Sequence, residues 1–534
     1  MAILDTKMDP ASAEYRRRRD HALAALANLD EEYAKVRMAG GEQKLARRRA
    51  EGRMQIRERI ENFIDPDAPF LEVAPFAAWG TDKAVGASYV TGIGVVEGTE
   101  VMISGHDASI RGGAMNSLTL RKQIRALDIC IKNRMPYVWF VESGGGDLND
   151  ILEMAVPGGE VFRQTSELSS MGVPCLTIVF GNATAGGAYQ PGLSDHVIMI
   201  RERSHTFLAG RALTLMATGE VSTDEELGGA EMHSRVSGLN DLMAEDEMDA
   251  LRLGRQVIRR YNWTKQGPGP LELPVREPLH PAEDLLAVAP TDFKEPFDMW
   301  ELIARVVDGS EYDEYKPMYG TQLSCGWAAI HGYRVGILAN IQGILFSEES
   351  QKATNFIQLC NQRDIPLVFL MNSSGYMVGQ EYERGGIIKH GSQMVRAVAN
   401  SRVPHITIIP GSSYGAANYG MSGRGLRPNF LFCWPTTEVG VMGTEQMVGM
   451  LTMSSREAAE KRGREWTKEQ EDALAAAITE RLETEKKVLA SSGRILDDGV
   501  IDPRDTRDVI GFCLSVCHNA PVQGARNEFG VLRV

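Results

Sequence analysis

One segment of the sequence occurs twice, and this repeat constrains the fold more than any other feature. VPCLTIVFGNATAGGAY begins at Val173 and VPHITIIPGSSYGAANY begins at Val403, and the two align without a gap. MPYVWFVESGG from Met135 and IPLVFLMNSSG from Ile365 keep the same offset. A looser third pair, residues 98–101 and 332–335, has a slightly larger offset. A period this long indicates a duplicated domain rather than a solenoid.

Each copy alternates short apolar strands with helical segments. The first copy runs through GIGVVEGTEVMISG, the helical stretch SLTLRKQIRALDICIKN and the strand PYVWFVESG. The second copy repeats this scheme in GWAAIHGYRVGILAN, SQKATNFIQLCNQR and PLVFLMNSSG. Alternation of this kind is typical of α/β domains whose crossovers are mainly of the parallel type. The sequence therefore predicts two tandem α/β domains related by duplication.

Composition suggests where these domains begin and end. Residues 1–65 are predicted to be a helical segment, because apolar positions recur there at helical spacing. Seven of the 23 prolines lie in residues 268–296, which predicts a linker between domains at 66–267 and 297–534. A long charged helix is predicted over about residues 455–491, where Leu474, Ile478 and Leu482 recur one turn apart.

Charge and cysteine usage exclude several classes of protein. The formal net charge of −14 disfavours nucleic acid or an anionic membrane as the main partner. We found no apolar run of about 18 residues that could span a membrane. MAILDTKMDP has neither a signal core nor a transit pattern, so we expect a cytoplasmic protein. Cys513 and Cys517 lie one helical turn apart beside His518, but helix packing explains them better than a metal site, and no metal is predicted.

Small-residue loops follow the repeated strands. Gly186 and Gly187 of the first copy correspond to Ala416 and Ala417 of the second. Such loops offer no nucleophile or metal ligand, but their backbone N–H groups can bind a developing oxyanion. Close packing of a strand on a helix would explain one such loop equally well. Two equivalent loops, each paired with a second small-residue strand end (residues 144–146 and 373–375), favour anion binding.

Several motifs in order resemble a known family, the carboxyltransferase β subunits of biotin-dependent acyl-CoA carboxylases. The resemblance covers about residue 50 to the C-terminus and rests on RGGAMNSLTLRK, VESGGGDL, TAGGAYQPGLSD, FLAGRALTLMATGE, ELGGAEMHSRVSG, GILFSEESQKATNFIQLCNQRDIP, EYERGGIIKHGSQMV, NYGMSGRG, VMGTEQ and DDGVIDPRDTR. Any one of these motifs would be weak, but their number and order are specific. The family's fold is a pair of crotonase-like (ClpP/crotonase) domains, which would explain the repeat.

The resemblance implies a role for each loop. By position, Gly186 and Gly187 would hold the enolate of an acyl-CoA thioester, and Ala416 and Ala417 would hold the ureido oxygen of biotin. The implied chemistry needs no side-chain base, because the biotin anion left after loss of carbon dioxide removes the substrate proton. In the family the two sites face each other across a dimer interface within a hexamer. We found neither a biotinylation site nor a biotin carboxylase region, so we expect a separate biotin-bearing α subunit.

Further residues are candidates for binding the substrate. Arg111, Arg121 and Lys122 flank the first helix of the first copy and could meet CoA phosphates, although exposed surface charges are an equally good interpretation. The remaining candidates lie in the loops themselves: Gly144, Gly145, Ala185, Gly375 and Tyr419. His233 is interpreted as a structural histidine that bonds a loop carbonyl.

The substrate is the least constrained feature. GAANYGMSGRG and EYERGGIIKHG look like the methylcrotonyl-CoA and geranyl-CoA carboxylase branch, with Tyr419 near the acyl pocket. A propionyl-CoA, other branched or medium-chain acyl-CoA carboxylase subunit stays open, as does a biotin-dependent decarboxylase α subunit. A crotonase-type hydratase or isomerase would need carboxylates, but Glu142 corresponds to the neutral Asn372. The non-enzymatic alternative is an assembly subunit that binds acyl-CoA.

Overall fold

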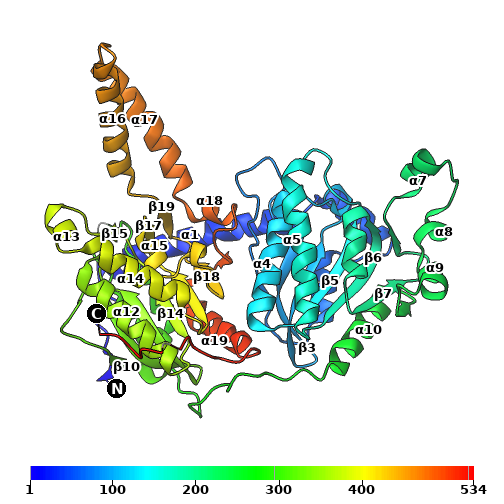
Figure 1. Cartoon of the computed structure of the whole chain (residues 1–534), viewed down its shortest axis with the longest axis horizontal. Helices are drawn as coiled ribbons and strands as arrows, with labels where there is room; N and C mark the ends of the chain where they lie inside the picture. Colours follow the sequence, from blue (N-terminus) through cyan, green and yellow to red (C-terminus); the bar gives the residue numbers. More distant parts are fainter. Residues whose placement is uncertain (1, 294, 527, 534) are drawn as a thin grey trace.

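Two α/β domains make up the computed structural model, which describes residues 2–293, 295–526 and 528–533 (Figure 1). The sheet of the first domain has the order β2-β3-β4-β5-β6-β7-β9, with β8 beside β6. Its strands are β2 (Leu71–Glu72), β3 (Tyr89–Val96), β4 (Thr99–His106), β5 (Tyr137–Ser143), β6 (Cys175–Thr184), β7 (His196–Ile200), β8 (His205–Phe207) and β9 (Leu242–Ala244). Its helices include α4 (Ser117–Asn133), α5 (Ile151–Ser170), α6 (Tyr189–Gly192), α7 (Arg211–Thr218), α8 (Asp224–Gly228), α9 (Ala230–Met232) and α10 (Glu247–Arg260).

The second domain repeats this arrangement with the strand order β1-β10-β11-β12-β14-β16-β18-β20. Its strands are β1 (Ala2–Ile3), β10 (Glu311–Glu314), β11 (Leu323–Ile330), β12 (Tyr333–Asn340), β14 (Leu367–Leu370), β16 (His405–Ile409), β18 (Phe430–Cys433) and β20 (Gly499–Val500). Two small sheets pair β13 (Ile344–Leu345) with β15 (Gly375–Tyr376), and β17 (Ser412–Tyr414) with β19 (Glu438–Gly440). The helices include α11 (Met299–Val306), α12 (Ser347–Gln362), α13 (Gln380–Arg384), α14 (Ile387–Asn400), α15 (Ala417–Gly420) and α19 (Thr506–Cys517).

The pairing of strands confirms the duplication residue by residue. Ser143 lies opposite Ala183 in the first domain, and Ser373 lies opposite Ser413 in the second, which keeps the offset of the long repeated segments. The slightly larger offset belongs to the hairpin β3–β4 and its counterpart β11–β12. The change arises in one loop. Residues 107–114 separate β4 from Met115, which pairs with Gly146, whereas the shorter stretch 341–344 separates β12 from the equivalent Leu345, which pairs with Tyr376.

Alternate residues of each strand serve the two faces of the sheet. In β5, Trp139 and Val141 pack in the cluster that contains α4 and α5, whereas Val138 and Phe140 pack in the cluster that contains α10 and α3 (Ile56–Phe63). Successive side chains of a strand point to opposite faces, so a strand covered on both faces is apolar throughout. This explains why PYVWFV shows no polar alternation.

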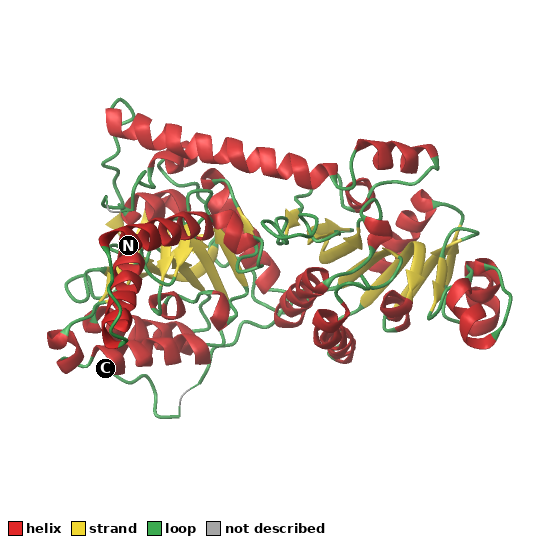
Figure 2. Cartoon of the chain, turned by 90° about the horizontal axis from the view of Figure 1, so that it is seen from above, coloured by secondary structure: helices red, strands yellow, loops and turns green. Residues whose placement is uncertain are grey.

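The N-terminal segment connects the two domains instead of forming a separate unit. It contains α1 (Ala13–Met38), α2 (Glu42–Ala50) and α3 (Ile56–Phe63). Strand β1 pairs with β10 of the second domain, and the Tyr15 hydroxyl donates to Asp284 at 2.7 Å. From there α1 runs along both domains towards α2 and α3, which lie on the first domain (Figure 1). The N-terminal strand and the C-terminal end of the chain both lie at the second domain (Figure 2).

Only the earlier part of the proline-rich stretch between the domains is an extended connection without regular structure. Residues 262–281 have no regular element and pass along one edge of the molecule (Figure 1). The short helix η4 (Ala282–Ala287) then packs against α1, and Leu285 and Leu286 are buried in the core. The later part of this stretch thus belongs to the packed body of the second domain.

The prediction of a single long helix over residues 455–491 is wrong. The structure has two helices, α16 (Thr444–Lys461) and α17 (Lys468–Glu485), which form a projecting hairpin followed by α18 (Val488–Ser492) (Figure 1). Gly463 has φ +66°, a left-handed conformation that ends the first helix, and the Thr467 side chain caps the second. The turn was hidden because the charged pattern continues through it.

A buried ion-pair network joins the domains. Arg125 of α4 donates to both carboxylate oxygens of Asp498, at 2.7 and 2.6 Å, and Arg424 of the second domain donates to the same carboxylate at 2.9 Å. Burial alone would raise the pKa of Asp498, but the charges of Arg125 and Arg424 lower this pKa to about 2. Asp498 is therefore ionised and paired across the domain boundary.

No helix within the described ranges is long and apolar enough to cross a membrane. All seven cysteines are buried and free, and no group of three or more His, Cys, Asp or Glu side chains in those ranges could hold a metal. Cys513 and Cys517 are fully buried on α19, which agrees with a packing role.

Asp497, beside this network, makes stability depend on pH. Burial raises the pKa of Asp497 to about 7, although the Ser492 hydroxyl donates to its carboxylate at 2.9 Å. An unfolded Asp has a pKa of about 4, so between about pH 4 and 7 the folded chain retains a proton that the unfolded chain has lost. We predict that the free energy of unfolding falls as the pH rises through this window, and that Asp497→Asn flattens this slope.

Urea unfolding at a series of pH values from 4 to 8 measures this slope. The control is Asp472→Asn, on the exposed face of α17, which should keep the wild-type slope. An unchanged slope in Asp497→Asn would contradict the prediction.

Candidate functional site

Three loops meet at the carboxyl ends of the first domain's strands. The N–H of Met115 donates to the carbonyl of Gly145 at 2.9 Å, and the N–H of Gly144 donates to the carbonyl of Gly112 at 3.0 Å. The Ser143 hydroxyl donates to the carbonyl of Gly113 at 2.9 Å. A Cβ on Gly113 would lie 2.1 Å from the carbonyl oxygen of Glu142, so this close approach requires glycine.

Gly186 and Gly187 complete this group of loops. They lie in the short helix η2 (Ala185–Ala188), directly after β6, and Ala185 turns the chain with φ +52°. Gly187 is buried and Gly186 is half-buried, and a Cβ on Gly145 would lie 3.8 Å from the Cβ of Ala185. The structure thus brings Gly144, Gly145 and residues 185–187 together. The first N–H groups of a helical turn lack helical partners, which suits them to an anionic oxygen.

The second domain has the equivalent arrangement. The N–H of Tyr414 donates to the carbonyl of Ser373 at 2.9 Å, and Gly375 lies opposite Ile344 in the small sheet β13–β15. Ala416 immediately precedes α15, of which Ala417 is the first residue. Within the described ranges, no residue accepts a hydrogen bond from the N–H of Ala416. This donor is therefore available to a ligand.

Tyr419 lies on α15, two residues after Ala417. Its side chain is 48% exposed, and the ring lies next to Gly425, where a Cβ would be 3.4 Å from the ring edge. An exposed phenol ring on the helix that follows Ala416 is available to contact a ligand.

The three cations proposed for CoA phosphates lie in different environments. Arg111 is exposed and pairs with Asp147 at 2.5 Å, in the loop that follows β5. Arg121 is exposed on α4. Lys122 is fully buried, and its ammonium donates to the carbonyl of Tyr89 at 2.6 Å, while burial lowers its pKa to about 7. Lys122 therefore does not reach the surface, and we do not carry it into the proposed site.

Glu142 is held by arginines from the N-terminal segment. Arg48 and Arg59 donate to one carboxylate oxygen at 2.7 Å each, and Arg53 donates to the other at 2.9 Å. Burial alone would raise the pKa of Glu142, but the charges of Arg59 and Arg48 outweigh burial and lower this pKa to about 2. A carboxylate so placed cannot serve as a general acid near neutral pH. Glu142 therefore does not supply the general acid that a hydratase or isomerase would need.

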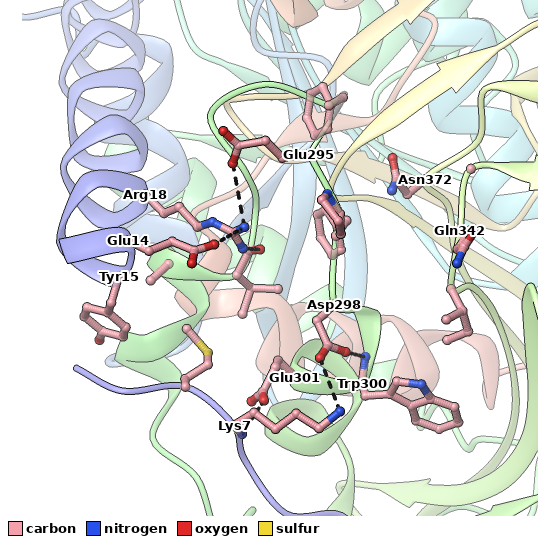
Figure 3. A pocket seen from close by; sticks show the side chains of 18 of the residues that line it. Lys7, Glu14, Tyr15, Arg18, Glu295, Asp298, Trp300, Glu301, Gln342 and Asn372 are labelled. Carbon is pink, nitrogen blue, oxygen red and sulfur yellow. Dashed lines mark hydrogen bonds and ion pairs between the residues drawn. The ribbon is translucent and has the colours of Figure 1, made fainter. Parts of the chain in front are cut away.

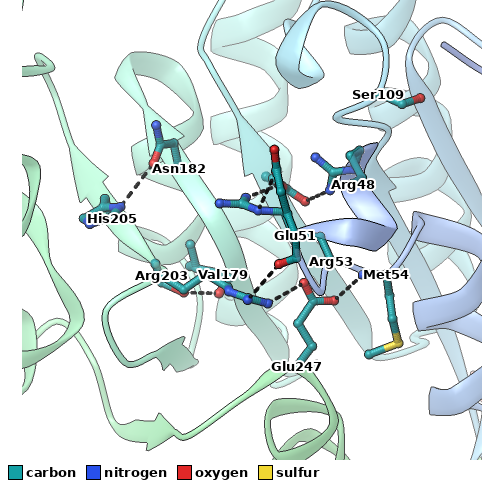
Figure 4. Close-up of polar contacts among 12 residues, drawn as sticks. Arg48, Glu51, Arg53, Met54, Ser109, Val179, Asn182, Arg203, His205 and Glu247 are labelled. Atoms are coloured by element: carbon teal, nitrogen blue, oxygen red, sulfur yellow. Dashed lines mark hydrogen bonds and ion pairs between the residues drawn. The ribbon is translucent and has the colours of Figure 1, made fainter. Parts of the chain in front are cut away.

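Sequence patterns alone did not reveal this arginine cluster, of which Arg48 and Arg53 are labelled in Figure 4. Its signal is the basic run LARRRAEGRMQIRER, which occurs just where α2 gives way to α3. A charged run of this kind is more often a solvated helix face, so only the fold shows that Arg48, Arg53 and Arg59 point inwards. His233, in contrast, is structural as expected, because its Nε2 lies 2.7 Å from the carbonyl oxygen of Thr206.

Similarity to known proteins identifies the family. A model of the carboxyl transferase domain matches residues 47–532. The chain belongs to this family. It is 53% identical, over the full length of both chains, to a probable biotin-dependent acyl-coenzyme A carboxylase β2 subunit of Mycobacterium tuberculosis. It is 41% identical to the mitochondrial methylcrotonoyl-CoA carboxylase β chain of Dictyostelium discoideum, covering 100% of this chain and 91% of the relative.

A solved structure supports the same assignment. The geranyl-CoA carboxylase β subunit of P. aeruginosa superposes with a TM-score of 0.90 at 38% identity, and the match covers 100% of both chains. The carboxyl transferase therefore has the pair of crotonase-like domains that the resemblance implied. The two loop groups described above occupy equivalent places in these domains.

Removing the charge of Glu142 tests whether this residue is structural. Glu142→Gln leaves Arg59 buried with one charged partner fewer, and breaking a buried ion pair costs about 3–5 kcal/mol. We predict a loss of unfolding free energy of this size, measured by urea denaturation, while the pH profile of activity in the remaining folded protein stays where it was.

The matched control is Glu167→Gln, which breaks the exposed pair between Glu167 and Arg163 on α5. Exposed pairs contribute about 0–1 kcal/mol, so this variant should unfold like the wild type. A stable Glu142→Gln protein with a selective loss of kcat would instead assign a catalytic role to Glu142.

Proposed function

We propose that this carboxyl transferase is the carboxyltransferase component of a biotin-dependent acyl-CoA carboxylase. It would transfer the carboxyl group from carboxybiotin, carried by a separate α subunit, to an acyl-CoA. The observation that carries this proposal is the pair of equivalent backbone loops, Gly186–Gly187 and Ala416–Ala417, in a chain of this family. The reaction forms two anions, the enolate of the acyl-CoA and the anion of biotin. The duplication provides one loop for each anion.

The first-domain loop suits the acyl-CoA. Removal of the proton next to a thioester places negative charge on the thioester oxygen. The N–H groups of Gly186 and Gly187 stabilise that charge, and each donor of this kind contributes about 3 kcal/mol to the transition state. A Cβ on Gly186 would find only Met115, at 3.8 Å, so the approach to the donors is open. Arg111 and Arg121, both exposed, are the candidates for the CoA phosphates.

The second-domain loop suits the ureido oxygen of biotin. Carboxybiotin supplies the carbon dioxide. The N–H groups of Ala416 and Ala417 polarise the ureido oxygen and hold the negative charge that remains on the ring. The available Ala416 donor fits this group, and the strand end that contains Gly375 is joined to this loop where the Tyr414 N–H donates to the Ser373 carbonyl. Gly186–Gly187 and Ala416–Ala417 have no ionisable side chains, so these donors do not compete for the proton being transferred.

We propose a methylcrotonyl-CoA-like substrate. The support is the GAANYGMSGRG loop, with Tyr419 on its helix, together with the methylcrotonoyl-CoA and geranyl-CoA carboxylase relatives reported above. The resemblance places Tyr419 near the acyl pocket, where its bulky phenol argues against copying a propionyl-CoA assignment. Another branched or medium-chain acyl-CoA is the alternative that substrate assays would distinguish.

We also propose a homo-oligomer built from dimers, a hexamer by resemblance. In the first domain, apolar side chains are exposed on α7 and just before it, namely Leu208, Leu213, Leu215 and Met216. Exposed apolar groups in one region favour burial against another chain. Association of two chains would let the first-domain loops of one face the second-domain loops of the other.

Isolation of the complex tests the proposed class. Affinity-tagged chain expressed in its native host should co-purify with a biotinylated protein, detected with streptavidin. The complex should fix labelled bicarbonate onto an acyl-CoA in an ATP-dependent reaction, fastest with methylcrotonyl-CoA in a panel of acyl-CoA thioesters. Absence of any biotinylated partner would overturn the proposal, and sodium-linked decarboxylation without ATP would favour the decarboxylase alternative.

A pair of substitutions at Gly186 tests the loop. Gly186→Leu should lower kcat at least about 100-fold, because a bulky side chain at the donors blocks the enolate oxygen, with an effect comparable to losing one donor. Gly186→Ala is the matched control, because Ala416 occupies the equivalent place and a Cβ there is in ordinary contact at 3.8 Å. Both variants should still bind the α subunit. Full turnover in Gly186→Leu would point to an assembly subunit.

A further inference from the structure

Ser143 lies where the loops of the first-domain site meet, and none of the roles proposed above uses it. It is the last residue of β5 and is 1% exposed. Its hydroxyl donates to the carbonyl of Gly113 at 2.9 Å and accepts from the N–H of Gly145 at 3.2 Å. A serine hydroxyl has a single proton to donate, and here the Gly113 carbonyl takes it. Ser143 can therefore act on the reaction only through its neighbours.

These neighbours include the proposed enolate donors. A Cβ on Gly187 would lie 3.5 Å from the Ser143 Cβ and 3.7 Å from its hydroxyl oxygen. Gly145, which donates to that hydroxyl, accepts from the Met115 N–H at 2.9 Å. The Met115 methyl group would be 3.8 Å from a Cβ on Gly186. Ser143 thus contacts the place of Gly187 directly and that of Gly186 through two further residues.

Two of the loops that Ser143 joins turn at glycines. Gly113 has φ +72° and Gly145 has φ +104°, values that glycine adopts without strain. Glycine has more conformational freedom than any other residue, so the hydrogen bonds around such a loop decide how rigid it is. Backbone donors stabilise an oxyanion best when they are held in place before the charge develops. A hydroxyl that bonds both glycine loops therefore favours catalysis by the donors beside it.

The equivalent serine of the second domain does not join its loops. Ser373 corresponds to Ser143 in the repeat and is fully buried. In the described part of the chain, its hydroxyl has no hydrogen-bond partner. The bonds of Ser143 are therefore a feature of the first domain and not a consequence of the shared fold.

The shorter loop after β12 explains this difference. Figure 3 shows Gln342 of this loop along the same side of a pocket as Asn372. The next residue, Gly343, corresponds to Gly113, but its carbonyl accepts from the Ser374 N–H at 2.6 Å. In the first domain the equivalent bond is made by the carbonyl of the residue before Gly113. The longer loop thus leaves one carbonyl for the serine hydroxyl, and the shorter loop does not.

We propose that Ser143 is a positioning residue for the carboxyl transfer, which holds the N–H donors of Gly186 and Gly187 where the enolate oxygen forms. It does not touch the substrate, because its side chain is buried and its proton is already donated. This inference rests on the proposed function, since it concerns the enolate side of that reaction. The biotin side has no such residue, because the Ser373 hydroxyl bonds neither of its loops.

Two variants of the same shape isolate the hydroxyl. Ser143→Thr keeps the hydroxyl and Ser143→Val replaces it with a methyl group, so crowding by the added carbon is common to both. In the complex with the biotin-bearing α subunit, kcat should be at least about tenfold lower in Ser143→Val than in Ser143→Thr, with KM for the acyl-CoA changed less than about twofold. The donors act on charge that appears only in the transition state, so their displacement lowers kcat and not ground-state binding.

The outcomes separate this inference from the proposed function. Equal kcat values in Ser143→Thr and Ser143→Val, or a difference confined to KM, overturn the role of Ser143 while the wild-type complex still carboxylates acyl-CoA. A wild-type complex that does not carboxylate any acyl-CoA overturns the proposed function and, with it, this role.

Ser310→Ala is the matched control for stability. Ser310 is fully buried in the second domain, and its hydroxyl donates to the Ala304 carbonyl at 2.7 Å and accepts from the Leu279 N–H at 2.9 Å. Ser143→Ala and Ser310→Ala therefore remove the same kinds of bond, and both should lower the midpoint of urea unfolding. Only Ser143→Ala should lower kcat, by at least about tenfold. An equal loss of kcat in both variants would indicate a general effect of stability and would overturn the assignment.

Discussion

The buried pair between Arg125 and Asp498 is the interaction on which the arrangement of the domains depends. A fully buried carboxylate is unfavourable unless its charge is compensated, and here the compensation comes from the other domain. Arg125 also donates to the carbonyl of Asn429, at 2.7 Å, in the chain that returns from the α15 loop. Separating the domains would remove Arg125 from Asp498 and leave this carboxylate with Arg424 alone. The pair therefore couples the two halves of the duplication, although each has its own sheet.

This coupling also explains why the repeat alone could not yield the architecture. The repeat correctly predicted paired α/β domains, because strands such as PYVWFV and CLTIVFG report burial on both faces through their composition. It could not predict that α1 connects the domains, since that contact depends on partners hundreds of residues away, such as Tyr15 and Asp284. The break between α16 and α17 was missed for the opposite reason, because one local glycine decides it within an uninterrupted charged pattern.

The residues of the candidate site fall into the same two groups, those that sequence patterns reveal and those that they do not. Loops made of small residues were recognisable because their lack of side chains is itself the signal, and the structure places residues 144–145 beside residues 185–187. Side-chain contacts over long distances were not recognisable. In the sequence Lys122 is a candidate surface cation, but in the structure its ammonium donates to the Tyr89 carbonyl. Glu142 is a candidate acid in the sequence, but in the structure Arg48, Arg53 and Arg59 surround its carboxylate.

The backbone character of the paired loops has a consequence for how such a protein can change. Every amino acid except proline supplies an N–H group, so most single-codon changes at Gly186 or Ala416 leave the donor in place and alter only what surrounds it. The glycines of one copy and the alanines of the other are an instance of this latitude. The side chains around the proposed donors can thus change over time while the donors themselves stay in place.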